Sequence, residues 1–341
     1  VLAAELEAAN LALTSSFTLV IVPDLFMTLE TLQVAFESIL SKYPYAQLVL
    51  VGLPGLPNTV WPATWILNAD LHARSIAKLL QHLVSTKRLA GIPPVDLATL
   101  PHHAPLFFMG VGHSAYSLSR FVTQFLPSLP EVQVRTRAVC MVNGLLRYNK
   151  RFKQICKDLR ESMQTASAHE VNELIASLHF FDEHLVAVGR DAALEKFWSS
   201  RRGLQMERGA TEYAGMGFFG VLEQLKGILL SPDDFDGAQL LLSDIPLLVV
   251  QSTEDVFVDP KNAALFRPEM LPPERTLVSD ISDALDSGAV HVSWLKAGHE
   301  VVQERTPFLL GFVSQLAQIC GIRPVNAPVI EKPSVHDDDD I

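Results

Sequence analysis

The stretch Leu106-Phe107-Phe108-Met109-Gly110-Val111-Gly112-His113-Ser114 decides the fold. A short apolar run bounded by turn residues is typical of a buried strand. Glycines follow at once, and a helical pattern then runs on to a point before Pro127, which indicates a sharp turn from the strand into a helix. A buried strand that turns directly into a helix favours an α/β architecture.

Five further apolar runs predict strands of the same kind. They span residues 17–22, 47–51, 138–142, 246–251 and 290–295. Helical patterns at residues 29–40, 70–84 and 306–320 alternate with or follow these runs. Strands that are apolar throughout and are separated by helices predict a mostly parallel sheet that is buried on both faces.

The alternation stops between residues 145 and 243, where only helical patterns occur. The predicted helices of this block span residues 152–163, 170–185, 192–198 and 218–230. An all-helical block between two strands indicates an insertion over the sheet. We therefore divide the chain into residues 1–144 and 244–322 as the two parts of an α/β core, residues 145–243 as a helical cap, and residues 323–341 as an extended acidic tail.

Chemically useful side chains follow three of the predicted strands. Gly112-His113-Ser114 comes after the strand at 106–109, Glu254-Asp255 after the strand at 246–251, and Gly298-His299-Glu300 after the strand at 290–295. In an open parallel sheet the carboxyl ends of the strands border one crevice, so residues far apart in sequence can meet there.

A serine, an aspartate and a histidine in this order, each after a strand, resemble the α/β-hydrolase fold superfamily. The resemblance covers residues 17–320 and includes Leu53-Pro54-Gly55 after the second strand and the cap before the strand that carries the acid. It implies an α/β-hydrolase fold with a helical cap inserted late in the sheet.

The resemblance also implies a role for each site residue. Ser114 would be the nucleophile, His299 its general base, and Asp255 the group that orients His299, with Asp259 as a fallback for the acid. The backbone N–H of Ala115, together with that of Leu25 or Phe26, would bind the oxyanion.

The sequence departs from the family pattern where the oxyanion is bound. Hydrolases of this superfamily usually carry His-Gly after the first of these strands, and here the matching residues are Pro23-Asp24. Asp24 would place a carboxylate near the point where negative charge must develop. Loss of one oxyanion donor typically costs about 10²–10³ in rate. The aspartate that often follows the second strand is Gly52 here.

The turn that carries the nucleophile can be aligned in two registers. It needs small residues two before and two after the nucleophile, because strand and helix backbones approach closely there. With Ser114 as the nucleophile these are Gly112, which fits, and Tyr116, which does not. With Gly112 at that position they are Gly110 and Ser114, both small, but glycine has no side chain that could attack a substrate.

These departures favour a non-catalytic domain that acts as a structural or protein-interaction module of a larger assembly. Pro23-Asp24-Leu25-Phe26 and Leu53-Pro54-Gly55 weakly resemble hydrolase-like domains of large cytoskeletal and ciliary proteins, which implies a cytoplasmic, cytoskeletal or ciliary setting. The cap would then be the docking surface for other proteins. Its candidate anchors are His179-Phe180-Phe181, Phe197-Trp198 and Phe218-Phe219.

The alternative is a cytosolic serine hydrolase that uses Ser114, Asp255 and His299 on an ester, a thioester or a small acyl substrate. The cap would supply an apolar pocket for an acyl ligand. Such chemistry needs neither a cofactor nor a metal, and His102-His103 lacks further ligands at the usual metal spacing.

Composition and charge narrow the range of partners. The net charge of −11, without a cluster of Lys and Arg, argues against a nucleic-acid groove. No apolar run reaches the roughly 18–20 residues that span a bilayer, so membrane insertion is not expected. The chain holds three cysteines without a C-x-x-C pair, which indicates a reducing compartment. A first residue of Val1 suggests a piece of a longer product, and residues 336–340 form a like-charge run that we expect to be solvated.

Overall fold

The computed structural model places seven parallel strands in one sheet, in the spatial order β2-β1-β3-β4-β5-β7-β6. It describes residues 16–56, 59, 61–62, 64–89, 104–146, 148–199, 212–231, 240, 243–259, 271 and 276–324. The strands are β1 (Thr18–Val22), β2 (Gln47–Leu50), β3 (Leu106–Val111), β4 (Thr136–Val142), β5 (Leu247–Ser252), β6 (Leu277–Val278) and β7 (Val290–Leu295).

Six of these strands were predicted from the sequence, and the parallel sheet is confirmed. The prediction missed β6, which holds only two residues at the edge of the sheet and pairs with β7 alone. An edge strand of this length buries little surface, so it leaves no apolar run for a sequence pattern to detect.

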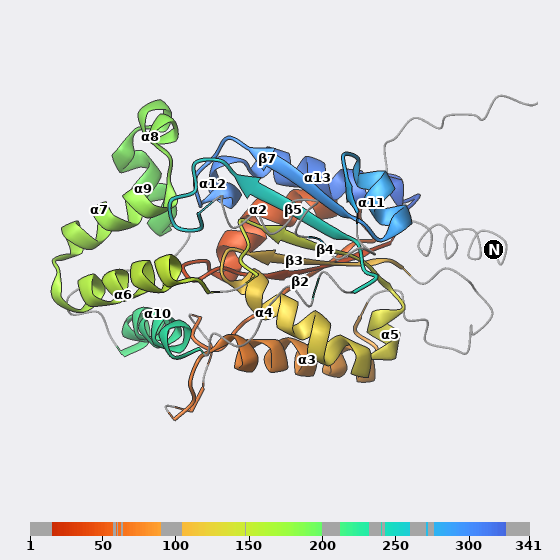
Figure 1. Ribbon diagram of the computed structural model, residues 1–341, viewed down its shortest axis with the longest axis horizontal. Helices are drawn as coiled ribbons and strands as arrows, with labels where there is room; N and C mark the ends of the chain where they lie inside the picture. The colour runs from red at the N-terminus through yellow and green to blue at the C-terminus, as the bar shows by residue number, and fades with distance from the viewer. Residues whose placement is uncertain are drawn as a thin grey trace, which may run out of the picture.

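Helices cover both faces of the sheet (Figure 1). One face packs against α2 (Leu29–Lys42), α11 (Ile281–Ser287), α12 (Val301–Glu304) and α13 (Thr306–Ile319). The other face packs against α3 (Ala69–Ser85), α4 (Ser114–Arg120) and α5 (Pro130–Gln133). The chain continues from α4 through a π-helical turn at Phe121–Phe125 and a 3₁₀ turn at Leu126–Ser128, so the helix predicted to end before Pro127 changes its form before it ends.

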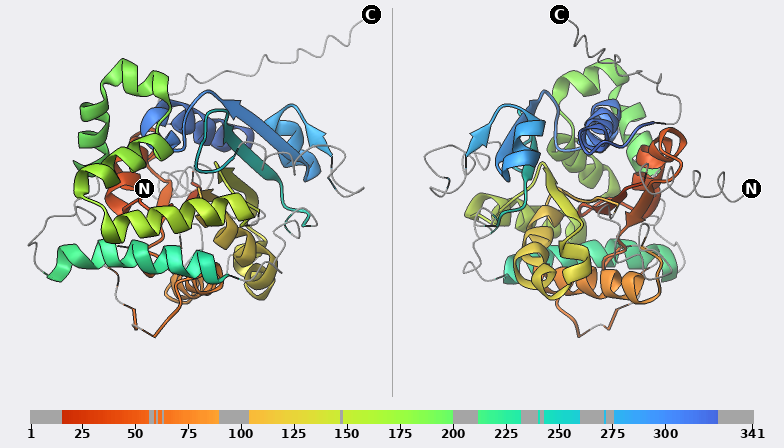
Figure 2. Two further views of the ribbon diagram at one scale, coloured as in Figure 1. Left: turned by 60° about the vertical axis from the view of Figure 1, so that its left-hand side comes forward. Right: turned by 90° about the vertical axis from the view of Figure 1, so that its right-hand side faces the viewer.

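A block of helices is inserted between β4 and β5, as expected, and lies at one end of the sheet (Figures 1 and 2). The cap consists of α6 (Lys150–Thr165), α7 (Ala168–His179), α8 (Asp182–Val188), α9 (Arg190–Ser199) and α10 (Glu212–Leu230). The single helix predicted over 170–185 is in fact two, because Phe180 and Phe181 adopt extended backbone angles. Both rings are buried, at 3% and 8% exposure, so their burial accompanies the break.

The cap packs onto the loops at the carboxyl ends of the strands through an apolar cluster. This cluster joins side chains of the cap helices to Leu25 after β1, Leu145 after β4 and Phe257 after β5. Phe180, Phe181 and Phe197, which we had taken as anchors for a partner, belong to the interior. Those anchors were therefore wrong, because rings at helical spacing here fill the contact between cap and core.

The described residues test some of the remaining predictions, and other predictions fall outside them. Of the remaining anchors, His179 is buried and Phe219 is 49% exposed, while the side chains of Trp198 and Phe218 lie outside the described residues. Within the described ranges, no helix is both long and apolar enough to cross a membrane. His102-His103 and the acidic run at 336–340 lie outside the described residues.

Candidate functional site

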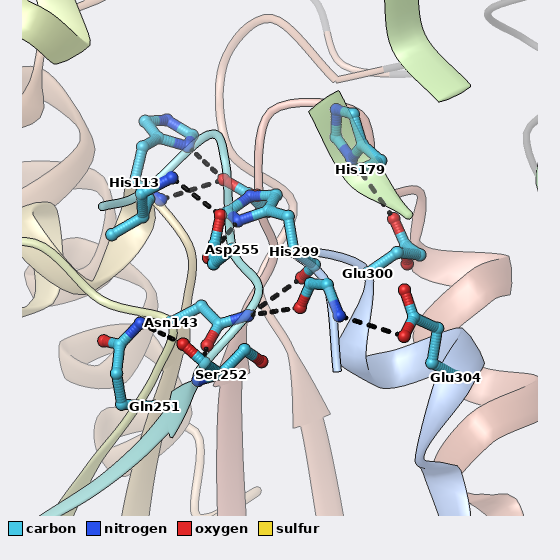
Figure 3. A network of polar contacts seen from close by, with 12 residues as sticks. His113, Asn143, His179, Gln251, Ser252, Asp255, His299, Glu300 and Glu304 are labelled. Carbon is cyan, nitrogen blue, oxygen red and sulfur yellow. Dashed lines mark hydrogen bonds and ion pairs between the residues drawn. The ribbon is translucent and has the colours of Figure 1, made fainter. Parts of the chain in front are cut away.

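Four loops bring their polar side chains together at the carboxyl ends of neighbouring strands. Asp24 follows β1, His113 follows β3, Asp255 follows β5 and His299 follows β7. Figure 3 shows His113, Asp255 and His299 side by side in one network of polar contacts. All four residues are buried, with exposures between 1% and 3%. The predicted convergence of these loops at one rim of the sheet is what the structure shows.

His299 lies between two carboxylates. Its Nδ1 is 2.8 Å from Asp255 Oδ2, and its Nε2 is 2.6 Å from Asp24 Oδ2. Both distances are those of charge-assisted hydrogen bonds, in which each ring nitrogen donates to a carboxylate. The Asp255–His299 contact is the one that orients the histidine in a hydrolase, whereas the Asp24–His299 contact occupies the nitrogen that would serve as the base.

The charges of this group set the protonation of His299. Burial by itself lowers the pKa of His299, but the carboxylates of Asp255 and Asp24 raise this pKa well above its ordinary value. Burial raises the pKa of Asp24, but the positive charge of His299 and the hydrogen bonds from His113 and His299 hold it well below its usual value. The two carboxylates therefore favour the imidazolium form of His299.

Asp24 has a second set of partners on the turn after β3. Its Oδ1 accepts from the backbone N–H of His113 at 2.9 Å and from Nδ1 of the same residue at 2.7 Å. The carboxylate thus accepts three hydrogen bonds, two from His113 and one from His299. This number of partners offsets the cost of burying a charged group.

Gly112 is the strained residue of the turn after β3. Gly112 has a φ of +56°, and it precedes the helical residue His113. A Cβ atom on Gly112 would lie 2.1–2.3 Å from the carboxylate atoms of Asp24. At Gly110 a Cβ would lie 2.7 Å from Cα of Ala115, which is the close approach of strand and helix that requires a small residue there.

Ser114 lies two residues further along, at the start of α4, and is fully buried. Its Oγ lies 2.8 Å from the backbone carbonyls of both Val22 and Val111, and it can donate to either. Among the described residues, no hydrogen bond joins Ser114 to His299. The hydroxyl that the resemblance would make the nucleophile links the ends of β1 and β3 to α4.

The residues expected to bind the oxyanion are all buried. The N–H of Ala115 donates to the carbonyl of Gly112, as in the first turn of a helix. Leu25 and Phe26 are buried in the cluster between cap and core. In the Gly112 register the donor next to the nucleophile position is the N–H of His113, and this group donates to Asp24. The fallback acid Asp259 forms an ion pair with Arg151.

Asn143 is a site residue that the sequence analysis missed. It follows β4 with a φ of +49° and is fully buried. Its Nδ2 donates to the carbonyls of Gly298 and His299, both at 3.1 Å, and its Oδ1 accepts from the N–H of Ser252 at 2.8 Å (Figure 3). Asn143 therefore links the end of β5 to the histidine loop. The available signal was a polar residue directly after the apolar run 138–142.

The histidine loop is also held by its own helix and by the cap. Glu304 Oε2 accepts from the N–H of Gly298 at 3.0 Å, and burial raises the pKa of Glu304 to about 7. The N–H of Glu300 donates to the carbonyl of His179 in the cap at 2.8 Å, and the Glu300 carboxylate is 3.6 Å from Nδ1 of that histidine (Figure 3). The cap is thus bonded directly to the loop that carries His299.

Aromatic rings form a continuous row over this site. Ring centroids are 4.2 Å apart for Tyr116 and Tyr148, 5.5 Å for Tyr148 and Phe152, and 5.2 Å for Phe152 and Phe257. The row ends on His299, whose ring centroid is 4.8 Å from that of Phe257. Each of the four rings is at most 7% exposed. Side chains of the core and the cap therefore pack directly on the face of the site that a substrate would approach.

Among the described residues, no group of three or more His, Cys, Asp or Glu side chains is arranged to hold a metal ion. The buried network is thus an arrangement of hydrogen bonds and ion pairs, not a ligand set. It can hold a positively charged imidazole and a carboxylate together away from water.

Comparison with solved structures shows the fold. The chain matches an alpha/beta hydrolase enzyme from a Medee basin deep-sea metagenome library with a TM-score of 0.62 and 12% identity, over 93% of this chain and 92% of the other. It matches a thermophilic esterase from Thermogutta terrifontis with a TM-score of 0.58, 13% identity, and coverage of 89% and 90%. An enol-lactonase from Burkholderia xenovorans LB400 matches with a TM-score of 0.58, 12% identity, and coverage of 89% and 92%.

The chain therefore has the α/β-hydrolase fold, as the order of its motifs predicted. No family model matches the sequence, and no curated protein matches it. The names of the matched structures fit the serine-hydrolase alternative better than a non-catalytic module, and nothing in the comparisons supports a cytoskeletal or ciliary setting. At these identities the likeness shows the fold alone, so the site geometry must carry any argument about chemistry.

Proposed function

We propose that this chain is an α/β-hydrolase-fold domain that does not hydrolyse substrates through Ser114 and that serves as a structural or protein-binding module. One observation carries the proposal: the Asp24 carboxylate lies where a side chain on Gly112 would be and bonds to His299. A hydrolase of this fold needs a nucleophile side chain at that point.

The protonation of His299 supports the same conclusion. A general base must have a free lone pair on Nε2 to take the proton of the nucleophile. Here Nε2 lies 2.6 Å from Asp24 Oδ2, and two carboxylates raise the pKa of the ring, so we expect Nε2 to carry a proton and to be occupied as a hydrogen-bond donor. The retained Asp255–His299 pair then acts as a buried contact that links the loops after β5 and β7.

Labelling with a fluorophosphonate probe tests the proposal. We expect no covalent adduct on the native domain under conditions in which an active serine hydrolase is labelled to completion. The matched control is Ser114→Ala, which removes the hydroxyl at the start of α4 and should leave any background labelling unchanged. An adduct on Ser114, identified by peptide mass spectrometry and absent from the variant, would overturn the proposal.

The second candidate function is the serine hydrolase itself, acting on an ester, a thioester or a small acyl substrate. It is favoured by the Asp255–His299 hydrogen bond and by matched structures that are named as an esterase and an enol-lactonase. It requires Asp24 to leave His299 and Ser114 Oγ to leave the carbonyls of Val22 and Val111. The labelling experiment separates the two functions, because only this one predicts an adduct.

A further inference from the structure

The Asp24 carboxylate is held in the manner of a bound ligand. Its two oxygens have different hydrogen-bond partners. Oδ1 contacts the backbone N–H and Nδ1 of His113, and Oδ2 contacts Nε2 of His299. These three donors belong to loops after β3 and β7, whereas Asp24 comes from the loop after β1. The donors therefore form a site that is independent of the residue that fills it.

This site lies beside the turn after β3, where a hydrolase of this fold would hold its substrate. With Gly112 at the nucleophile position, the N–H of His113 is the donor that would hold the oxyanion, and Nε2 of His299 faces the nucleophile. The two oxygens of Asp24 thus occupy the places of a carbonyl oxygen and of an attacking oxygen. A carboxylic acid product of hydrolysis would present its two oxygens to the same donors.

We propose that His113 and His299 form a binding site for small monocarboxylates, and that Asp24 is the internal ligand that occupies it. The proposal rests on the Gly112 register used in the proposed function. When the Asp24 side chain is removed, a free carboxylate takes its place. Its size follows from the atoms removed: Asp24→Gly leaves room for acetate, whereas Asp24→Ala retains Cβ and leaves room for formate.

The site is held in shape without Asp24. Asp255 bonds to the opposite nitrogen of His299, and Asn143 binds the carbonyl of the same residue. His113 is the first residue of a helical turn, so its N–H keeps its direction when Asp24 is shortened. Without the charge of Asp24, the Asp255–His299 pair carries no net charge. A bound monocarboxylate restores the original net charge of the site.

Thermal unfolding at pH 6 tests this site, with sodium acetate or sodium formate compared with sodium chloride at equal ionic strength. For Asp24→Gly we expect acetate to raise Tm in a saturable way, by about 5 °C at a hundred times its dissociation constant. For Asp24→Ala we expect formate to do so and acetate to have less effect. The native protein, whose site is filled, should respond equally to all three salts.

Refolding yield provides a second measurement if a variant unfolds too readily for a melting curve. Each variant is refolded from denaturant in acetate, formate or chloride, and we expect the matched carboxylate alone to increase the recovered fraction. The proposal is overturned if chloride acts as well as the carboxylates, if the native protein gains as much as the variants, or if neither carboxylate improves either variant. Its failure is distinct from that of the proposed function, which depends on labelling of Ser114 in the native protein.

Discussion

Replacement of Asp24 by Asn should switch the charge state of His299 at little cost in stability. The amide has the shape of the carboxylate, so its oxygen can keep the two hydrogen bonds from His113 at 2.7 and 2.9 Å. Its NH₂ group then faces Nε2 of His299, where two donors cannot bond to each other. The contact is restored when His299 loses its proton from Nε2 and accepts, while Nδ1 still donates to Asp255.

The magnitude follows from the three hydrogen bonds of the carboxylate. Each becomes a neutral bond in Asp24→Asn, which loses about 1 kcal/mol per bond. An amide is easier to bury than a carboxylate, so we expect a net cost of about 1–2 kcal/mol at pH 6. Asp24→Ala leaves the three donors without an acceptor and should cost about 3–5 kcal/mol, the usual effect of breaking a buried ion pair. The two variants therefore separate the role of the charge from that of the hydrogen bonds.

The pH dependence gives a sharper test. Because the folded-state pKa of His299 is raised, its contribution to native stability is complete below about pH 6.5 and is lost as the pH rises towards the folded pKa. Asp24→Asn lacks this loss. Above pH 6.5 the difference between native and variant stability should narrow by up to about 1.4 kcal/mol per pH unit.

Urea unfolding between pH 5 and pH 8 measures the difference in stability between the native protein and Asp24→Asn. ¹⁵N-histidine NMR of the folded state measures the protonation of the His299 ring. We expect the His299 ring to be doubly protonated at pH 7 in the native protein and neutral in Asp24→Asn. The reasoning is refuted if Asn destabilises as much as Ala at every pH, or if His299 keeps its charge in the Asn variant.

Three further predictions concern single contacts in the same site. Gly112→Ala should lower the free energy of unfolding by about 3 kcal/mol, because its Cβ would overlap the Asp24 carboxylate at a positive φ. In urea unfolding this cost should be smaller in an Asp24→Gly background, and additive costs of the two substitutions would contradict the overlap. Asn143→Gly keeps a permissive backbone but removes three buried hydrogen bonds, so we expect a loss of about 2–4 kcal/mol in the same assay, and a loss below about 1 kcal/mol would show that the link to His299 is unimportant. The pKa of Asp24 is lowered, so its contribution to stability is present above about pH 3.9 and is lost as the pH falls. The gap between native protein and Asp24→Asn should therefore close in acid-unfolding experiments below about pH 4.

Most of the fold could be predicted because its signals are local. The run at 106–111 is fully buried and turns at once into a helix, and five similar apolar runs form the other predicted strands. Boundaries moved by a few residues, and the prediction failed where local signals are weak. The two residues of β6 are too few to form a pattern. The break between α7 and α8 accompanies the burial of the Phe180 and Phe181 rings, which depends on the tertiary structure.

The candidate site was predictable in part. The loops after β1, β3, β5 and β7 could be expected to meet, since parallel strands end on one side of a sheet, and Asp24 could be expected near the oxyanion position. The role of Asn143 could not, because its three partners lie at positions 252, 298 and 299, far away along the chain. The anchors proposed for the cap were wrong because helical spacing does not show whether an aromatic face packs against the core or is exposed to a partner.

By itself the sequence determined the class of fold, the order of the motifs, and the choice of two registers for the turn after β3. Those properties depend on the type and spacing of residues along the chain. Only the tertiary structure gave Gly112 its positive φ and placed Asp24 on His299, because a contact between residues 275 positions apart depends on how the sheet brings their strands together. The same sheet favours the charged form of His299, since it brings two carboxylates from different loops to the ring and their effect on its pKa outweighs that of burial.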